Sequence, residues 1–431
     1  MATFPAPTHR EALHAAFVDG RFANPFGGIE HQQSLWRPNP DDVEALHPEA
    51  RQLFAQTLQQ VISPEWEGSG RILLVRGEAG VGKTHLMRAY RQMAHATQRA
   101  YVGYVQINRS VTEPFKHILD RLIHSLEQPY DSAESPQSGL RRLAAGLLEA
   151  PEIAELYFKH RDDDTLHPAA ELLRSGDLAA NQRQQVVREI RHRLASADRF
   201  SAIDPRLIQA VLLLEVGDAE LSHCVKSYLR GDDLSADERA LLGDIVPKPR
   251  AEQALLLIGQ LGQLMEKVGD AALVLLVDQL EDILGGDDAV DRLEGLLNSC
   301  RAIAEAAPTS LIVLSTLGAI FDQYFAKLPR SLADRIVDDF PKPIALKPPT
   351  TQAQVAALVG ARLTKLYRQA QLEPPPDCCP FGDAELKAWV NLRPRDILNA
   401  AYEWREAAVA RGQYTSELAT SPRTTPPPPP P

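Results

Sequence analysis

Residues 77–84 contain the side chains best suited to chemistry. They read Gly-Glu-Ala-Gly-Val-Gly-Lys-Thr and match the pattern G-x-x-x-x-G-K-[ST] at every fixed position. The glycines allow a tight turn in which successive backbone N–H groups point at one anion. Lys83 would reach the β- and γ-phosphates of a nucleotide, and the Thr84 hydroxyl would bind Mg²⁺. The predicted nucleotide-binding residues here are Gly77, Glu78, Ala79, Gly80, Val81, Gly82, Lys83, Thr84 and His85.

The sequence on either side of this segment supports a phosphate-binding loop. Residues 71–76 form a short apolar run typical of a buried strand, and residues 85–93 carry apolar side chains at helical spacing. In a strand–loop–helix arrangement the positive end of the helix faces the bound phosphate. The alternative is a Gly-rich turn with an incidental lysine, which the flanking strand and helix disfavour. The sequence therefore predicts that the chain binds a nucleoside triphosphate, ATP with Mg²⁺.

A candidate Mg²⁺-binding carboxylate directly follows the apolar run at residues 271–277. Asp278 ends this run, and an aspartate in that place holds Mg²⁺ in nucleotidases with this kind of loop. Two residues compete to act on the attacking water, because Gln279 follows directly and Glu281 comes two residues later. Glutamine can position water but accepts no proton, so Glu281 is the preferred catalytic base. The alternative is that Glu281 only begins the next helix.

Further polar side chains occur where they could contact the phosphates. Ser315 and Thr316 end an apolar run, and a hydroxyl there either reads the γ-phosphate or simply ends a strand. Arg330 and Arg335 precede the last short strand. Either could stabilise transition-state charge in a neighbouring subunit, or form a salt bridge. Arg395 stands at a helix start, against the dipole preference, which indicates a functional role.

The composition is that of a globular chain. It has 431 residues, enough for two or three packed units, of which 44% are hydrophobic and 24% charged. The net charge of −11 excludes a basic footprint over the whole chain but not a local basic patch. The four cysteines show neither metal-ligand nor disulfide spacing, which favours a reducing cytoplasm. The sequence predicts neither a membrane span nor a secretory signal.

Strands that alternate with helices predict an α/β fold with a P-loop NTPase parallel sheet, a large helical insertion and a C-terminal helical lid. We expect residues 1–40 to form an irregular arm, 41–346 the ATPase core, 347–412 the lid and 413–431 a Pro-rich disordered tail. The insertion, residues 140–250, shows helical spacing and no strand. Its most basic part holds Arg183, Arg188, Arg191, Arg193 and Arg199. A solvated helix face is favoured there over a nucleic-acid or partner contact.

The order and type of these motifs resemble the AAA+ ATPase superfamily. Residues 77–84 resemble its Walker A motif, and the run that ends in Asp278 resembles its Walker B motif. The order of elements is similar to the origin-recognition and Cdc6-like branch over about residues 41–130 and 250–412. The resemblance implies an oligomer in the ATP state, with DNA and other proteins as candidate partners. The lack of an apolar stretch long enough to span a membrane predicts no membrane partner.

The same resemblance implies roles for the other polar residues. Ser315 or Thr316 looks like sensor 1, Arg335 like an arginine finger, and Arg395 like the sensor 2 arginine of the lid. Gln279 departs from the AAA+ pattern, which has a glutamate at this place, and this departure argues against fast hydrolysis.

Two narrower resemblances bear on the biological role. Residues 278–284, Asp-Gln-Leu-Glu-Asp-Ile-Leu, resemble the D-Q-F-E-E-L-F version of Walker B in STAND-type signalling ATPases. Residues 228–234, Tyr-Leu-Arg-Gly-Asp-Asp-Leu, look like the ATPases found in BREX-type phage-defence operons. Two functions follow as expectations. One is an ATPase that assembles on or remodels DNA, in phage defence, and the other is a slowly hydrolysing nucleotide switch that recruits protein partners. A metabolic kinase is disfavoured.

Overall fold

The computed structural model describes residues 8–27, 35–36, 42–130, 137–159, 166–175, 179–216, 218–243, 245, 250–328 and 343–414. The chain divides into two compact units. We call Arg51–Arg76 with Met87–Ala345 the sheet unit, and Met1–Ala50 with Gly77–Leu86 and Leu346–Pro431 the loop unit. The predicted core, residues 41–346, therefore contributes segments to both units. Arg330 and Arg335 lie outside the described residues, as do residues 415–431 of the predicted tail.

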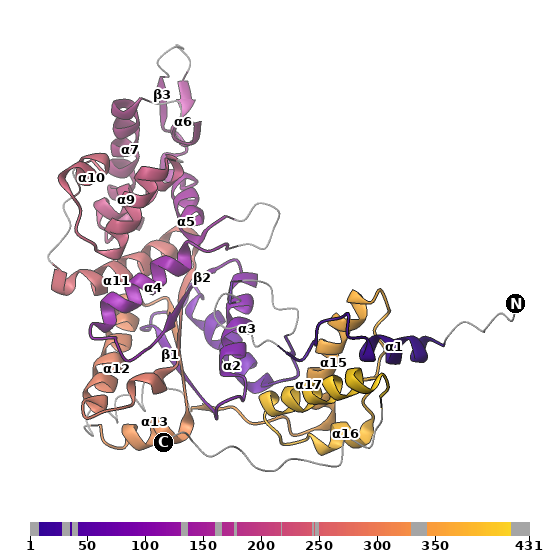
Figure 1. The fold of residues 1–431 in the computed structure, drawn as a ribbon. Helices are drawn as coiled ribbons and strands as arrows, with labels where there is room; N and C mark the ends of the chain where they lie inside the picture. Colours follow the sequence, from indigo (N-terminus) through magenta and orange to yellow (C-terminus); the bar gives the residue numbers. More distant parts are fainter. Residues whose placement is uncertain are drawn as a thin grey trace, which may run out of the picture. The chain divides into compact units, whose positions relative to one another are not determined.

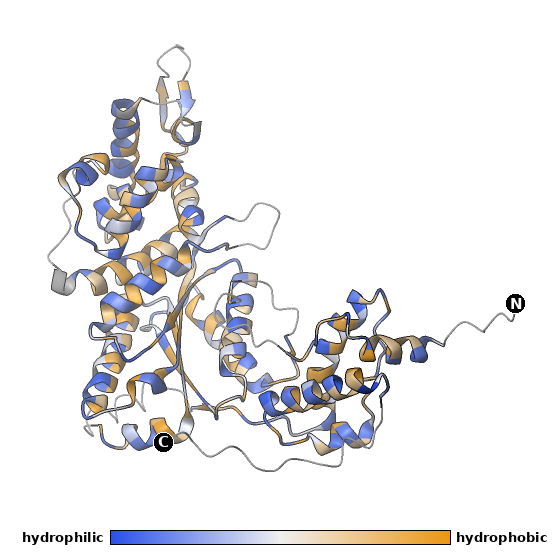
Figure 2. Ribbon diagram, viewed as in Figure 1, coloured by the Kyte–Doolittle hydropathy of each residue, from blue (hydrophilic) through white to orange (hydrophobic). Residues whose placement is uncertain are grey.

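A five-stranded parallel sheet forms the centre of the sheet unit (Figure 1). Its strands, in spatial order, are β2 (Ala100–Gln106), β5 (Ala272–Asp278), β6 (Ser310–Thr316), β1 (Arg71–Arg76) and β7 (Ile344–Ala345). Every residue of β5 and β6 is buried, which explains their continuous apolar runs, since a parallel sheet is covered on both faces. Figure 2 shows that the strands are hydrophobic, whereas the helices carry both hydrophobic and hydrophilic residues. The predicted α/β fold is confirmed.

The carboxyl ends of these strands meet at one edge of the sheet. β5 pairs with β2 so that Asp278 lies opposite Gln106, and β6 pairs with β1 so that Ser315 lies opposite Val75. The chain leaves β1 toward β2 in one direction and leaves β6 toward β7 in the other. Parallel α/β sheets bind their ligands where the connections from two neighbouring strands run in opposite directions. A ligand is therefore expected beyond the ends of β1 and β6.

Helices cover both faces of the sheet. One face carries α4 (Pro114–Leu126), α11 (Arg250–Gly269) and α12 (Ala289–Ala306), and the sheet-unit parts of α2 (Pro48–Val61) and α3 (Lys83–Ala96) lie on the other (Figure 1). A short 3₁₀ helix, η4 (Leu280–Ile283), follows β5, and α13 (Gly318–Phe325) follows β6. Both begin at the carboxyl edge of the sheet.

The predicted helical insertion lies between α4 and α11. Its helices are α5 (Gly139–Leu148), α6 (Ala169–Ser175), α7 (Ala180–Ala195), α8 (Pro205–Leu212), α9 (Ala219–Arg230) and α10 (Ala236–Leu241). Buried side chains of these helices are continuous with those under α4 and α11, so the insertion shares one hydrophobic core with the sheet. The insertion also contains a hairpin of β3 (Tyr157–Lys159) and β4 (Leu166–Pro168). The expectation of no strand was wrong here, because three-residue strands are too short to show an alternating pattern.

The loop unit packs the N-terminal segment against the C-terminal helices. These helices are α1 (His9–Val18), α15 (Gln352–Gln369), α16 (Asp383–Ala388) and α17 (Pro394–Arg411). The expectation that residues 1–40 are irregular is corrected at α1, which Thr8 caps with a capping box and whose Phe17 is fully buried among the C-terminal helices. Arg405 of α17 is also buried, and its guanidinium donates hydrogen bonds to the carbonyls of Phe17, Asp19 and Phe22.

Apolar side chains at helical spacing predict one helix over residues 41–62 and another over 383–411, and the structure shortens the first and divides the second. The helix expected from residue 41 begins only at Pro48, because His47 has a φ of 56° and proline suits a first turn. The helix expected over residues 383–411 is divided into α16 and α17, with Asn391 at a φ of 66° between them. Among the described residues, none of the helices has the length and apolar character needed to cross a membrane.

Candidate functional site

The glycine-rich segment of the loop unit has the backbone of an anion cradle. Gly80 and Gly82 have φ angles of 82° and 108°, which L-residues rarely adopt, and Val81 between them is buried. α3 begins immediately afterwards, at Lys83. A Cβ atom added to Gly77 would lie 2.6 Å from Cγ1 of Val81, so the loop has no room for a larger residue there. A glycine-rich turn that leads directly into the first turn of a helix is an arrangement that can bind an anion.

Three consecutive loop carbonyls are held by groups from elsewhere in the loop unit. Nη1 of Arg393 donates to the Ala79 carbonyl at 3.4 Å, and the backbone N–H of Arg395 donates to the Gly80 carbonyl at 3.2 Å. Nε2 of His47 lies 3.1 Å from the Val81 carbonyl oxygen. Carbonyl oxygens repel phosphate, so occupying them with these groups favours a loop in which the amides face the anion.

Lys83 lies over the start of the same loop. Its Nζ donates to the carbonyls of Gly77 at 3.1 Å and Glu78 at 3.3 Å, and the residue is only 9% exposed. Thr84 and His85 follow in the first turn of α3. The N-terminal end of α17 also meets the loop, since a Cβ on Gly80 would lie 2.9 Å from Cβ of Arg395. The structure therefore brings Arg395 to the glycine-rich segment.

Gly80→Ala is expected to weaken nucleotide binding about tenfold or more. A left-handed conformation costs a non-glycine residue roughly 1–2 kcal/mol, and the added methyl group must also displace Arg395. Titration with a fluorescent ATP analogue measures the change. Gly295→Ala is the matched control, because nothing lies within 4 Å of a Cβ at that position of α12. Equal affinities in the two variants would contradict this account of the loop.

Asp278 is the acidic group at the carboxyl edge of the sheet. It is fully buried at the last position of β5. Its Oδ2 accepts a hydrogen bond from the Tyr104 hydroxyl at 3.2 Å, and its Oδ1 accepts one from the Gln279 N–H at 2.9 Å. Burial, followed by the charge of Asp278, raises the pKa of Tyr104 well above its usual range. The hydroxyl therefore stays protonated and acts as the hydrogen-bond donor to Asp278. Asp278 is thereby fixed in one orientation.

Gln279 is held by a neighbouring glutamine. It has a φ of 64°, and its side-chain oxygen accepts a hydrogen bond from Nε2 of Gln106, the last residue of β2. Left-handed non-glycine residues cluster at functional sites, where surrounding contacts maintain the strain. His117 of α4 supports this arrangement indirectly. Its Nε2 lies 2.8 Å from the carbonyl oxygen of Gln106, the residue that holds Gln279.

Glu281 connects the ends of two strands. It lies in η4, as the alternative interpretation of a helix start required, and its Oε2 accepts a hydrogen bond at 3.2 Å from the N–H of Leu317, the residue after β6. The carboxylate is therefore anchored next to Ser315 and Thr316. Both of these residues are fully buried, and their hydroxyls have no hydrogen-bond partner among the described residues. A buried hydroxyl without a partner is costly, which indicates a ligand or water as the missing partner.

Sequence reasoning missed several residues that surround the glycine-rich segment or the carboxyl ends of the sheet strands. They are His47, Arg76, Tyr104, Gln106, His117, Asp322 and Leu317. Arg76, the last residue of β1, forms an ion pair with Asp322 of α13. Its place directly before the glycine-rich segment was a usable signal, and so was the polar Gln106 at the end of an apolar strand. His47 offered no signal in the sequence. Arg330 and Arg335, the predicted arginine fingers, lie outside the described residues.

Comparison with known proteins adds similarity of fold. No protein-family model matches the chain, and no curated protein matches it. Among solved structures, it is similar to the ORC2 protein of Aeropyrum pernix in ADPNP and ADP complexes, with 12% identity and a TM-score of 0.43, over 91% of this chain and 71% of that one. It is also similar to Cdc6p from Pyrobaculum aerophilum, with 12% identity and a TM-score of 0.37, over 89% of this chain and 67% of that one. Neither similarity is close enough to assign a role to any residue.

Proposed function

We propose that the chain binds ATP with Mg²⁺ and hydrolyses it as an ATPase of the AAA+ type. One observation carries the proposal. The glycine-rich segment matches the phosphate-binding pattern in full, and its positive φ angles at Gly80 and Gly82 come directly before a helix that starts at Lys83. Amides at such a helix start bind phosphate, and a lysine there opposes its charge.

The chemistry of the residues fits both ATP and Mg²⁺. Asp278 is a buried carboxylate and Thr84 a hydroxyl, and Mg²⁺ prefers hard oxygen ligands of these kinds. The buried hydroxyls of Ser315 and Thr316 suit a phosphate oxygen or a water molecule. Asp278 and Thr84 would hold Mg²⁺, which would supply positive charge that offsets the charge of the phosphates. Lys83 and the loop amides would hold the phosphates.

Glu281 is proposed to accept the proton of the attacking water. Its carboxylate is the only one of the two competing side chains that can do so, and the Leu317 N–H fixes its orientation. Gln279 would position the same water without taking a proton. Arg395 is proposed to contact the nucleotide from α17, whose first turn already meets the loop at Gly80.

A slow nucleotide switch is the second candidate function. The observation that favours it is the Gln106–Gln279 hydrogen bond, which places a neutral amide pair beside Asp278, where the AAA+ pattern has an acid. Binding would then be tight and hydrolysis slow, and the ATP state would recruit a protein partner. The STAND-like residues 278–284 point the same way by resemblance.

The partners are proposed from the sequence resemblance. The chain would assemble in the ATP state, with Arg335 of one subunit completing the site of the next, and would act on DNA. The BREX-like residues 228–234 suggest phage defence as the setting.

Specific ATPase activity is expected to rise with protein concentration, by roughly tenfold or more across the range in which subunits meet, because an arginine supplied in trans strongly stabilises the transition state. Turnover is measured over a dilution series together with light scattering in ATP. Arg330→Ala is the control for Arg335→Ala, since only the trans arginine should abolish the rise. Constant specific activity from a monomer would count against assembly.

Duplex DNA separates the two candidate functions in the same assay. Strong stimulation of turnover by DNA supports the remodelling ATPase. Tight ATP binding with slow, DNA-independent turnover supports the switch.

A further inference from the structure

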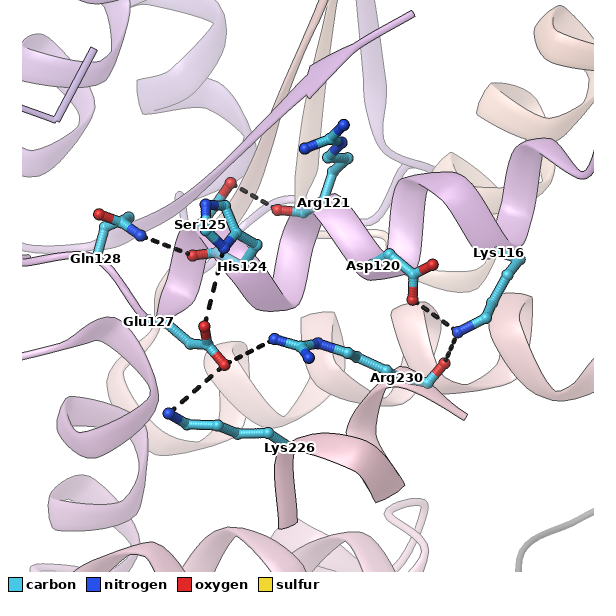
Figure 3. Close-up of polar contacts among 9 residues, drawn as sticks. All are labelled: Lys116, Asp120, Arg121, His124, Ser125, Glu127, Gln128, Lys226 and Arg230. Atoms are coloured by element: carbon cyan, nitrogen blue, oxygen red, sulfur yellow. Dashed lines mark hydrogen bonds and ion pairs between the residues drawn. The ribbon is translucent and has the colours of Figure 1, made fainter. Parts of the chain in front are cut away.

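A group of charged residues joins α4 to α9 of the insertion (Figure 3). We call Lys116, Asp120, Glu127, Arg230 and Asp232, together with Lys226, the α4–α9 clip. Nζ of Lys116 donates to Asp120 at 2.7 Å, to the Arg230 carbonyl at 2.8 Å and to Asp232 at 2.9 Å. All three donor sites of the ammonium are therefore used, and two of them bind the insertion.

The other end of the clip is centred on Glu127. Its Oε1 lies 3.0 Å from Nη2 of Arg230 and 3.6 Å from Nζ of Lys226 (Figure 3). The Glu127 side chain is only 18% exposed, so water screens these pairs less than it screens pairs on an open surface. Glu127 and Lys116 lie at opposite ends of α4, and the clip thus fixes the whole helix against α9.

The insertion side of the clip consists of Lys226 and the segment 228–234, to which the proposed function gives no part in ATP hydrolysis. Tyr228 and Leu229 are buried in the shared core. Gly231 ends α9 in the left-handed conformation, with a φ of 72°, and the turn brings the Arg230 carbonyl and Asp232 to Lys116. Burial lowers the pKa of Lys116, but hydrogen bonds to Asp120 and Asp232 outweigh it and raise the pKa, so the ammonium stays charged.

α4 also holds the two β2 residues that contact the acidic end of β5. Oγ of Ser125 accepts a hydrogen bond from the Tyr104 N–H at 2.9 Å, and it donates to the Arg121 carbonyl within α4. His117 lies against the Gln106 carbonyl, as described above. Tyr104 in turn donates to Asp278, and Gln106 donates to Gln279. One helix therefore contacts the insertion on one side and, through two β2 residues, the acidic end of β5 on the other.

We propose that Lys116 is a positioning residue that couples the insertion to hydrolysis. Through α4 it sets where Gln106 holds Gln279, so a change at residues 228–234 alters the rate of the chemical step. This inference rests on the proposed function. A merely structural clip would lower stability and leave the rate per folded molecule unchanged.

Lys116→Met removes the ammonium and keeps most of the side chain. We expect ATP affinity within about twofold of wild type and a single-turnover rate changed roughly fivefold, the usual scale of such coupling. Lys116→Arg should recover most of the rate. Arg174→Met is the control, because its ion pair with Glu215, at 3.1 Å, lies wholly within the insertion.

In a Gln279→Ala background the effect of Lys116→Met on the single-turnover rate should shrink to less than about twofold, since coupled sites are not additive. Additive effects, or a rate change equal to that of the Arg174 control, would overturn the proposal.

Hydrogen exchange gives a readout that does not depend on ATP. The Ile107 N–H donates to the Asp278 carbonyl at 3.0 Å and reports how the end of β2 sits against β5. Its exchange should be faster in Lys116→Met than in Arg174→Met at matched melting temperature. Equal exchange overturns the positioning role even if ATP binds as proposed. Failure of the wild-type chain to bind ATP would instead refute the proposed function and leave the exchange result to decide what Lys116 does.

Discussion

Lys83→Ala lowers ATP affinity by roughly a hundredfold or more in our expectation. Lys83 is only slightly exposed, and its ammonium lies over the loop, where each hydrogen bond to a charged group contributes about 1.5–3 kcal/mol. Losing such contacts to two phosphates gives an effect of this size, since about 1.4 kcal/mol is tenfold. The loop itself should persist, because its shape comes from Gly80, Gly82 and the contacts on its carbonyls.

Isothermal titration with ATP and Mg²⁺ measures the effect. Lys387→Ala serves as the matched control, since it removes an exposed lysine from α16 of the same unit. Circular dichroism and the melting temperature confirm that each variant is folded. A folded Lys83→Ala protein with the affinity and turnover of wild type would refute the nucleotide site.

The loop could be predicted from sequence because its determinants are local. Gly80, Gly82 and Lys83 lie within four positions of one another, and the strand before them and the helix after them are set by short-range patterns. Asp278 was predictable for the same reason, as the polar end of an apolar run. The sheet followed from the alternation of such runs with helices.

Hydrogen bonds from residues distant in the sequence hold these site residues in place, and no local sequence pattern predicts them. His47 meets the Val81 carbonyl across 34 positions, and Tyr104 meets Asp278 across 174. Arg393 reaches Ala79 across 314. A hydrogen bond between distant residues leaves no periodicity in either segment, so only the folded chain reveals it.

The same reasoning explains the corrected elements. The Pro-rich and Gly-rich segments around α1 predict turns, but Thr8 and Glu11 form a capping box that begins a helix. The division between α16 and α17 depends on the backbone angle of Asn391, which apolar spacing does not encode. Residues 228–234 form a recognisable sequence motif, but their contacts with α4 depend on the tertiary fold.

The second large effect concerns the base. Glu281→Gln should retain ATP binding and lower the single-turnover rate by roughly a hundredfold or more, the contribution of a general base. The substitution is conservative in shape, because a glutamine oxygen can still accept the hydrogen bond from the Leu317 N–H. What it removes is the ability to take a proton. Asp282→Asn, at the exposed next position of η4, is the control and should leave the rate near that of wild type.

Gln279→Ala tests the competing assignment. If Gln279 alone positions the water, Gln279→Ala should show the large loss and Glu281→Gln should be mild. If Glu281 is the base and Gln106 only holds Gln279 aside, the order of the two effects reverses. Binding and single-turnover rates must be measured for both variants, since the melting temperature alone cannot separate a lost base from a loosened strand end. Near-normal rates in both would show that neither residue acts on the water. We expect the larger loss at Glu281, because its carboxylate is anchored by the N–H of the residue that follows two buried hydroxyls, which themselves have no hydrogen-bond partner among the described residues.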